Sequence, residues 1–485
     1  MHRPSLTAVA IGAATLMACA TNPATGKKQL MLVTEAQEIA MGKAADQEVI
    51  AAYGLYPDQK VQAYVDRLGK GLAAESERPD LPWSFKVVDD PSVNAFALPG
   101  GYIYVTRGIM THLRSEAELV AVLGHEIGHV TARHSASQMS KQQLAMGGLM
   151  VGMVVKPELQ RFGDLAQQAM GLLFLKFGRD DENQADELGL RYMTREDYDS
   201  REMLEVFSVL DDVTRAEGGG ARMPDWLSTH PSPGNRTTRI QEQIAATGAS
   251  GSMVNQRAYL RQLDGRVFGD NPREGFFQEN AFYHPDLRFQ LAFPRSFKTQ
   301  NQKQAVVGVS EAQDAIIALT LGGGASPEEA ARQFFSQQGV QAGRSGRDTI
   351  GGLPAYTAFF EAAAEQGSLR GQVAFVSYDG KVYRILGYTP AGRFSTYQRA
   401  FDTAIRSFRR LSDPRYLDVQ PKRIALVNPG RQMGLPEFDR AYPSTVKIET
   451  IGLINGVDAN QMFPRGELAK RVVGGRLPGD GPGRS

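Results

Sequence analysis

The chain has 485 residues, enough for several domains that each have a hydrophobic core. Its 54 basic and 53 acidic residues nearly cancel, which argues against a protein dedicated to binding nucleic acid. Cys19 is the single cysteine of the sequence, so the chain forms no internal disulfide.

The N-terminal residues have the composition of a lipoprotein signal peptide. An apolar run too short for a comfortable membrane span ends in residues 16–19 (Leu-Met-Ala-Cys), which resemble a bacterial lipobox. We therefore expect residues 1–18 to be removed, Cys19 to be lipidated and residues 19–34 to form a polar tether. A plain secretory signal is the alternative. Because Ala20 follows the cysteine, the resemblance to Gram-negative lipoproteins implies a periplasmic protein anchored to the outer membrane.

A mainly helical domain with a small sheet is predicted for residues 35–247. Its first part, Glu35–Glu75, has a helical pattern that is interrupted near Gly54. The next predicted elements are strands at Trp83–Val88, Val93–Ala97 and Gly101–Thr106, and a helix at Ser115–Ser135 with Ser115 as its N-cap and Glu118 as the capping-box partner.

The helix predicted at Ser115–Ser135 contains a motif that indicates a chemistry. Residues 125–129 read His-Glu-Ile-Gly-His. Positions four apart share a helical face, so His125 and His129 can direct ring nitrogens at one zinc ion. Glu126 then lies beside the metal, where the general base for a water nucleophile belongs. The alternative is an ordinary amphipathic helix with two surface histidines.

Three segments after this helix also have a helical pattern. Residues 144–155 are apolar and rich in glycine and methionine, which favours a closely packed buried helix. A mobile lid or a segment that touches a membrane is the alternative. Helices are also predicted at Ala166–Arg195 and at Met203–Ala216.

A catalytic zinc site needs three protein ligands and one open position. The acidic residues near 180–187 can supply the third ligand, but composition leaves Asp181, Glu182 and Glu187 open, and such runs are commonly a solvated helix face. If Glu182 binds the metal, Asp186 shares its helical face and can accept a hydrogen bond from a ligating imidazole.

These segments together resemble the HtpX/BepA/Oma-type zinc metallopeptidases, which are relatives of the CAAX prenyl proteases. The resemblance covers about residues 30–245. It rests on H-E-x-x-H, on E-x-x-A-D at residues 182–186, on the strand-turn-strand segment 94–105 and on the S/T-H-P-x-x-x-x-R segment 228–236. It implies a zincin-type fold, one zinc ion per chain, metal ligands His125, His129 and Glu182, the base Glu126 and the supporting residue Asp186.

Further site residues follow from the same resemblance and from strand patterns. His230 is expected either to stabilise an oxyanion or to occupy the open metal position and repress the enzyme. Arg236 is expected either to help bind the substrate or oxyanion, or to pair with an acidic residue. An exposed edge strand that binds unfolded peptide through its backbone is expected at Asn94, Ala95 and Phe96.

The second half of the chain is predicted to be non-catalytic. We expect a linker at 248–280, a mainly antiparallel α+β domain at 281–411 that resembles PsbP/DcrB-type domains, a small module at 413–473 that resembles LysM, and a disordered tail at 474–485. The predicted strands are Phe289–Phe293, Ala315–Leu321, Ala355–Glu361, Gly371–Tyr378 and Lys381–Tyr388, and the predicted helices are Pro327–Gln337 and Thr396–Phe408.

Together these features predict a membrane-tethered periplasmic zinc endopeptidase that cleaves misfolded or misassembled envelope proteins. Its expected partners are such substrates, the membrane through the lipid on Cys19, and either peptidoglycan or the outer-membrane assembly machinery, with no nucleic acid. The alternative is a chaperone-like assembly or binding factor whose protease site is normally repressed.

Overall fold

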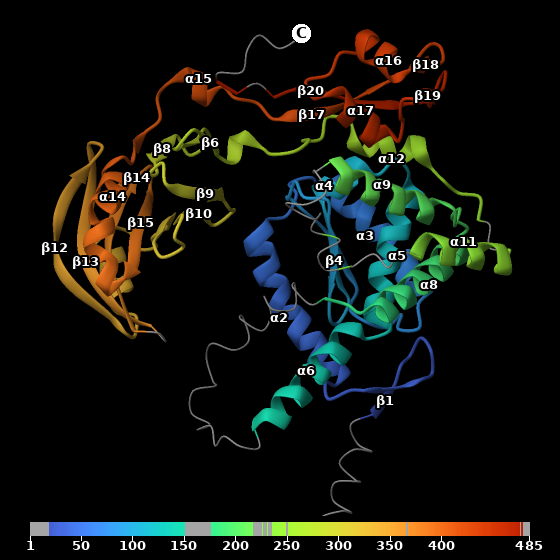
Figure 1. Ribbon diagram of the computed structural model, residues 1–485, viewed down its shortest axis with the longest axis horizontal. Coiled ribbons are helices and arrows are strands. Elements are labelled where there is room, and N and C mark those ends of the chain that lie inside the picture. The colour runs from blue at the N-terminus through green and yellow to red at the C-terminus, as the bar shows by residue number, and fades with distance from the viewer. Residues whose placement is uncertain are drawn as a thin grey trace, which may run out of the picture. The chain divides into compact units, whose positions relative to one another are not determined.

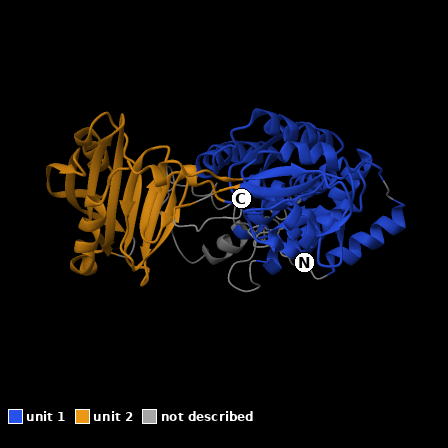
Figure 2. Cartoon of the chain, turned by 90° about the horizontal axis from the view of Figure 1, so that it is seen from above, with its two compact units in different colours: residues 1–269, 423–473, 484–485 blue, residues 270–422, 474–483 orange. Residues whose placement is uncertain are grey.

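The computed structural model describes residues 19–150, 176–216, 226, 230, 235–248, 251–364, 367–475 and 477–478. The chain divides into two compact units, which are coloured separately in Figure 2. We call residues 1–269, 423–473 and 484–485 the helical unit, and residues 270–422 and 474–483 the sheet unit. None of the described helices is long and apolar enough to cross a membrane.

The helical unit surrounds a three-stranded sheet with helices (Figure 1). The sheet has the order β3-β5-β4, in which β5 pairs parallel to β3 and antiparallel to β4. In chain order the elements are β1 (Cys19–Thr21), β2 (Lys28–Leu30), α2 (Glu35–Tyr53), α3 (Gln59–Ala74), β3 (Ser84–Val88), β4 (Ala95–Leu98), β5 (Tyr102–Thr106), α4 (Arg107–His112), α5 (Glu116–Thr131), α6 (His134–Met150), α8 (Arg179–Arg195), α9 (Glu202–Ala216), α11 (Arg236–Thr247) and α12 (Gln256–Leu263).

Helix α5, which contains the H-E-x-x-H motif, is buried along its whole length. Ser115 is its N-cap and accepts a hydrogen bond from the Glu118 amide, as predicted. Glu118 does not complete a capping box, because its carboxylate instead accepts from the amide and guanidinium of Arg114. The helix also ends earlier than predicted: Arg133 has a φ of 60°, and α6 begins at His134.

Helices α5 and α8 cross closely enough for their backbones to touch, and they lie side by side in Figure 1. A Cβ on Gly128 would lie 2.8 Å from the Ala185 carbonyl oxygen, and a Cβ on Gly189 would lie 2.8 Å from the His125 amide nitrogen. Only glycine permits this approach. The crossing places the acidic residues of α8 directly beside the histidines of α5.

The segment 19–34, expected to be a polar tether, is instead a β-hairpin that packs on the helical unit. Strands β1 and β2 pair antiparallel, with Cys19 opposite Leu30. Asn22 is 5% exposed, and Met31 and Val33 form a small buried cluster with Ala136 of α6. The segment is therefore structured by apolar and hydrogen-bonded contacts that its composition does not reveal.

The C-terminal segment 423–473 also differs from the separate module expected at 413–473. Its elements are β17 (Lys422–Val427), β18 (Met433–Gly434), α16 (Leu435–Ala441), α17 (Ile448–Asn455), β19 (Met462–Phe463) and β20 (Ala469–Gly474). Phe438, Ile451 and Phe463 are buried in the same hydrophobic core as α3, α5 and α9. The segment belongs to the helical unit because the two share one core.

Lys470 of β20 is fully buried and gives this segment a testable pH dependence. Its ammonium donates to the carbonyl oxygens of Thr111 and Leu113 at 3.0 and 2.7 Å, which lie at the end of α4. Burial lowers the pKa of Lys470 to about 7, although the nearby Glu118 carboxylate opposes the shift.

The unfolded chain therefore binds a proton that the folded chain lacks between about pH 7 and the ordinary lysine pKa of 10.5. Relative to Lys470→Met, the wild-type protein is expected to gain stability as the pH rises through that window, by at most about 1.4 kcal/mol per pH unit. Below about pH 7 the difference between the two proteins should level off. Urea unfolding of both proteins from pH 6 to 9 measures this, and parallel pH profiles would contradict a lowered pKa.

The sheet unit contains a seven-stranded antiparallel sheet of order β12-β13-β14-β15-β11-β10-β9 and a four-stranded sheet of order β16-β8-β7-β6. The strands are β6 (Phe276–Gln278), β7 (Ala281–His284), β8 (Phe289–Ala292), β9 (Phe297–Asn301), β10 (Ala305–Ser310), β11 (Ile316–Leu321), β12 (Val340–Ile350), β13 (Leu353–Ala364), β14 (Gly367–Tyr378), β15 (Lys381–Pro390) and β16 (Arg409–Arg410), and the longer helices are α13 (Pro327–Phe335) and α14 (Phe394–Arg406). The predicted antiparallel α+β class is confirmed.

Alternate side chains of β14 build two cores on the two faces of the larger sheet. Val373 and Phe375 pack with Phe334 of α13, whereas Ala374 and Val376 pack in the cluster that contains Phe401 of α14. The expected linker 248–280 is largely structured: it contains α12, whose Tyr259, Leu260 and Leu263 are buried in the core of the helical unit.

Several predicted segments lie outside the described residues. They are 1–18, the part of 144–155 beyond Met150, and the first third of the helix predicted at Ala166–Arg195. Most of the tail predicted at 474–485 also lies outside them.

Candidate metal centre

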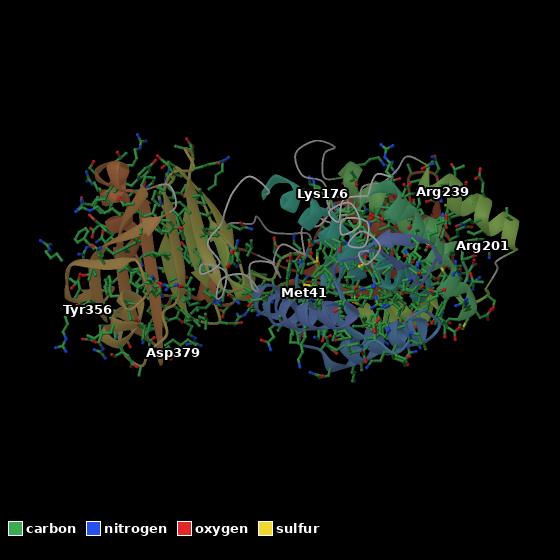
Figure 3. All side chains as sticks on the ribbon, turned by 90° about the horizontal axis from the view of Figure 1, so that it is seen from below. Met41, Lys176, Arg201, Arg239, Tyr356 and Asp379 are labelled. Atoms are coloured by element: carbon green, nitrogen blue, oxygen red, sulfur yellow. The ribbon has the colours of Figure 1, made fainter. Side chains whose placement is uncertain are left out.

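Four buried side chains bring possible metal-binding atoms together. His125, His129, Glu182 and His230 each offer one such atom, and these atoms lie within 4.8 Å of one another. His125 and His129 come from α5 and Glu182 from α8, so the glycine crossing sets their spacing. His230 comes from the segment after α9. The side chains in the structure are drawn in Figure 3.

The spacing of three of these donors fits a zinc ion. Donors about 2.0 Å from zinc in a tetrahedron lie about 3.3 Å from one another. The two Nε2 atoms of His125 and His129 are 3.0 Å apart, and they lie 3.7 and 3.5 Å from the nearer oxygens of Glu182. Two histidines and one glutamate form a known donor set of catalytic zinc sites.

The unsatisfied oxygen atoms and the net charge around the donor cluster are both consistent with a bound divalent metal ion. Both carboxylate oxygens of Glu126 and the Oε2 of Glu182 are buried without a hydrogen-bond partner. With the histidines neutral, as metal ligands are, the three buried carboxylates of Glu126, Glu182 and Asp186 face one buried guanidinium, that of Arg236, which leaves two negative charges. Uncompensated charge is costly in an interior, so a bound divalent cation would balance the cluster.

Asp186 and Arg236 fix the orientation of His125. The Nδ1 of His125 lies 2.9 Å from Oδ1 of Asp186, as expected for a residue that holds a ligating imidazole. Arg236 donates to both oxygens of Asp186, at 2.8 and 2.5 Å. Burial raises the pKa of Asp186, but Arg236 and His125 outweigh it, so the net shift is downward and the carboxylate stays charged. Of the two roles expected for Arg236, the geometry favours pairing with an acid.

Glu126 lies next to the donor cluster without belonging to it. Its Oε1 is 3.6 Å from Nε2 of His230. Burial raises the pKa of the Glu126 carboxyl, although His230 and His125 oppose the shift. A carboxylate beside the metal donors is in the position from which a general base accepts and returns a proton.

The three acidic residues left open by the sequence have distinct surroundings. Glu182 is fully buried. Burial alone would raise the pKa of its carboxyl, but His230 and His129 have the larger effect, so the net shift is downward and the carboxylate is charged. Glu187 forms an exposed ion pair with Arg239, which is labelled in Figure 3. Asp181 accepts from the Gly178 amide at the start of α8 and is partly exposed. Of the three, Glu182 is the residue in the donor cluster.

His230 lies inside the cluster rather than on the surface. Its Nδ1 is 3.0 Å from Oε1 of Glu182 and 3.3 Å from Nε2 of His125. The indole of Trp226 stacks on its ring, with centroids 4.7 Å apart, and the His230 amide donates to the Trp226 carbonyl. Residues 227–229 and 231–234 lie outside the described residues.

The segment Asn94–Phe96 is where an edge strand was expected. Strand β4 lies at the end of its sheet and against α5. Asn94 exchanges hydrogen bonds with Thr106 on one side, and its Oδ1 is buried without a partner. Ala95 and Phe96 are buried, and the Phe96 ring stacks on Tyr104 inside a hydrophobic cluster, so these side chains are not exposed as expected and only the backbone is suited to peptide binding.

Sequence reasoning missed three residues that contact the cluster. Phe177 stacks on His129 with centroids 4.1 Å apart, and His134 lies 2.9 Å from His129, between their Nδ1 atoms. Trp226 contacts His125 and His230. The position of His134, five residues after His129, could have suggested a role at the site. In an unbroken helix, however, its side chain would not face His129.

Comparison with known proteins identifies this part of the chain. Residues 59–244 match Peptidase family M48. They form an M48 peptidase domain. The matched range contains α5, α8 and all four donors of the cluster. M48 peptidases use zinc, so the predictions of a zinc ion and of a metallopeptidase domain are confirmed at this level.

The chain is also similar to parts of curated relatives. The chain is 37% identical over 189 residues to "Mitochondrial metalloendopeptidase OMA1" of Arabidopsis thaliana, which covers 38% of this chain and 36% of the relative. It is 30% identical over 211 residues to "Beta-barrel assembly-enhancing protease" of Yersinia pestis, which covers 41% of this chain and 42% of the relative. The chain thus spans less than half the length of these relatives.

The comparison of solved structures concerns a smaller part of the chain. The solution structure of cyanobacterial PsbP from Synechocystis is similar with a TM-score of 0.23 and 16% identity, and covers 26% of this chain and 89% of that one. A TM-score and an identity this low do not establish a shared fold, so the resemblance of residues 281–411 to PsbP/DcrB-type domains stays a prediction.

Proposed function

We propose that the whole chain is a zinc endopeptidase. The observation that carries this proposal is the buried set of His125, His129 and Glu182, with the unpartnered carboxylate of Glu126 beside it. Two histidines and one glutamate are a known ligand set of catalytic zinc sites, and here a carboxylate outside the set lies beside them. That pairing is what hydrolysis of a peptide bond requires.

The residues divide the work of hydrolysis as follows. A zinc ion in the site lowers the pKa of a water molecule and polarises the scissile carbonyl. Glu126 accepts the proton of the attacking water and later gives it to the leaving amine. Asp186, held by Arg236, keeps His125 in the tautomer that offers Nε2. The backbone of β4 holds the substrate as an added strand.

His230 is proposed to occupy the open position of the resting enzyme, because its Nδ1 lies among the donors. We expect His230→Ala to raise the basal cleavage of casein. If His230 instead stabilises the oxyanion, the same variant should lose about 10²-fold or more in turnover. The assay compares casein cleavage by the wild-type protein and by His230→Ala at equal zinc content and equal melting temperature. Trp226→Phe, which keeps an aromatic ring against His230, is the control. Unchanged kinetics would contradict both roles.

The proposed substrates are misfolded or misassembled envelope proteins. Support comes from the relatives named beta-barrel assembly-enhancing protease and from the lipobox-like residues before Cys19. A Glu126→Gln variant should bind substrates without cleaving them. Mass spectrometry of proteins retained by this variant in cells should therefore find envelope proteins. Retention of cytoplasmic proteins alone, or of the same set by a Glu126→Gln, Glu182→Ala double variant, would contradict the proposal.

The proposed location is the periplasmic face of the outer membrane, through a lipid on Cys19. Cys19→Ser is expected to move the protein to the soluble fraction without changing its melting temperature, because the substitution removes the thiol that would carry the lipid. Membrane fractionation and intact mass measure this. Equal partitioning of both proteins, with no lipid-modified mass, would contradict the anchor.

The position of His230 also favours a second candidate, a chaperone-like assembly factor whose protease site is normally repressed. In that case the wild-type protein should bind unfolded clients and cleave them only after substitution of His230. No catalytic role is proposed for residues 281–485, and in this second candidate they would bind the unfolded clients.

A further inference from the structure

A chain of hydrogen bonds connects the N-terminal hairpin to the metal ligand His129. The side-chain amide of Asn22 lies 3.5 Å from Oε1 of Gln184. The same Oε1 lies 2.8 Å from Nε2 of His134. The Nδ1 of His134 lies 2.9 Å from Nδ1 of His129. Asn22 and Gln184 are far apart in sequence, and His134 has no place in the H-E-x-x-H motif.

The orientation of the Asn22 amide is fixed within the hairpin. Its Oδ1 accepts from the backbone amides of Ala24 and Thr25, at 2.9 and 3.3 Å. Its Nδ2 must therefore be the donor, and it faces three carbonyl oxygens: those of Ala132, Gln29 and Gln184, at 3.2, 3.2 and 3.5 Å. The Asn22 donor thus directs the oxygen of the Gln184 side chain toward the hairpin and His134.

This orientation determines which nitrogens carry protons further along. The Gln184 oxygen can only accept, so His134 donates through Nε2–H. A neutral His134 then has a bare Nδ1, which accepts from Nδ1–H of His129. His129 is left with a bare Nε2, the atom that points into the donor cluster.

The break between α5 and α6 makes this contact possible. In a continuous helix, a residue five positions after His129 would lie about 140° around the axis and could not face it. Arg133 interrupts the helix with a φ of 60°, and its guanidinium donates to Glu38 and to the Val33 carbonyl. The residues that hold the break therefore also belong to the N-terminal part of the chain.

We propose that Asn22, Gln184 and His134 are positioning residues for His129, and that the hairpin 19–33 is thereby a structural part of the metal centre. The inference rests on the proposed zinc site. Asp186 orients the ring of His125 through a hydrogen bond to its Nδ1. His134 would orient the ring of His129 in the same way, with a neutral imidazole in place of a carboxylate. The strand that begins at Cys19 would then be coupled to the affinity of the site for zinc.

Zinc affinity, measured by chelator competition on the full-length protein, tests the relay. His134→Leu, which cannot accept from His129, is expected to weaken zinc binding about 10- to 100-fold. His134→Asn can place an acceptor near the Nδ1 position and should restore most of the affinity. Asn22→Asp keeps the turn, because it keeps Oδ1, but removes the donor to Gln184. It should weaken zinc binding in the same direction. Lys28→Ala, on the same hairpin, removes an ammonium that donates to Thr21, and it should leave zinc binding unchanged.

Melting of the metal-free proteins separates positioning from folding. A structural role alone would lower the melting temperature without changing the zinc affinity of the folded protein, and that result would overturn the proposal. Wild-type affinity in both folded His134→Leu and folded Asn22→Asp would also overturn it. If His134→Leu does not fold, Asn22→Asp and His134→Asn decide the question. A wild-type protein that binds no zinc would instead refute the proposed function.

Discussion

Glu182→Ala is expected to purify without zinc after dialysis against a weak chelator, whereas the wild-type protein should retain one ion per chain. The reason is that Glu182 supplies the only carboxylate oxygen among the four donor side chains found in the described residues. Its loss removes the one anionic donor and leaves only neutral imidazoles, so zinc is held less tightly even if His230 supplies a third nitrogen. Metal analysis and circular dichroism, run on the same samples, measure zinc content and fold together.

Two matched variants on the same helix control this result. Asp181→Ala and Glu187→Ala remove carboxylates of α8 that lie outside the donor cluster, so both should keep zinc. The zinc affinity of Asp186→Ala should lie between that of these controls and that of Glu182→Ala. We expect a loss of about 10- to 100-fold, because Asp186 supports a ligand and does not bind the metal. Zinc retained at full occupancy in Glu182→Ala would show that another residue is the third ligand.

Glu126→Gln is expected to keep its zinc and to lose proteolysis by a factor of about 10² to 10⁴. The amide occupies the same volume but cannot accept the proton of the attacking water, and no donor atom of the metal set is changed. Cleavage of unfolded casein at equal zinc content measures the loss. Glu187→Gln, an exposed change of the same kind, is the control and should cleave normally. Near-normal turnover of Glu126→Gln with zinc bound would rule out Glu126 as the base.

The sequence predicted those parts of the site that lie on one regular helix. His125 and His129 were placed together because four residues along a helix return to the same face, and the structure has them on one buried face of α5. The approach of α8 was not predictable in the same way. It depends on Gly128 meeting Ala185, and Gly189 meeting Gly124 and His125, across two helices, which local periodicity does not report.

Interactions between distant residues account for most of what the sequence did not predict. His134 was missed because the break at Arg133 is held by Glu38 and Val33, far away in the chain. Strand β12 was missed because its residues are mostly polar and exposed, and its strand conformation is fixed by pairing with β13. The C-terminal segment was expected to be a separate module because it resembles LysM, and its local pattern does not show that Phe438, Ile451 and Phe463 share the core of α5.

The central claim is that this chain hydrolyses peptide bonds with zinc bound at His125, His129 and Glu182. The most direct measurement is the cleavage of unfolded casein by three samples of full-length protein: as purified, after chelation, and after the return of one equivalent of zinc. His230→Ala is measured in parallel, so that a repressed site is not mistaken for an inactive one. We predict cleavage that chelation abolishes and zinc restores, in at least His230→Ala. Cleavage that survives complete removal of the metal, or no cleavage by either zinc-loaded protein, would contradict the account.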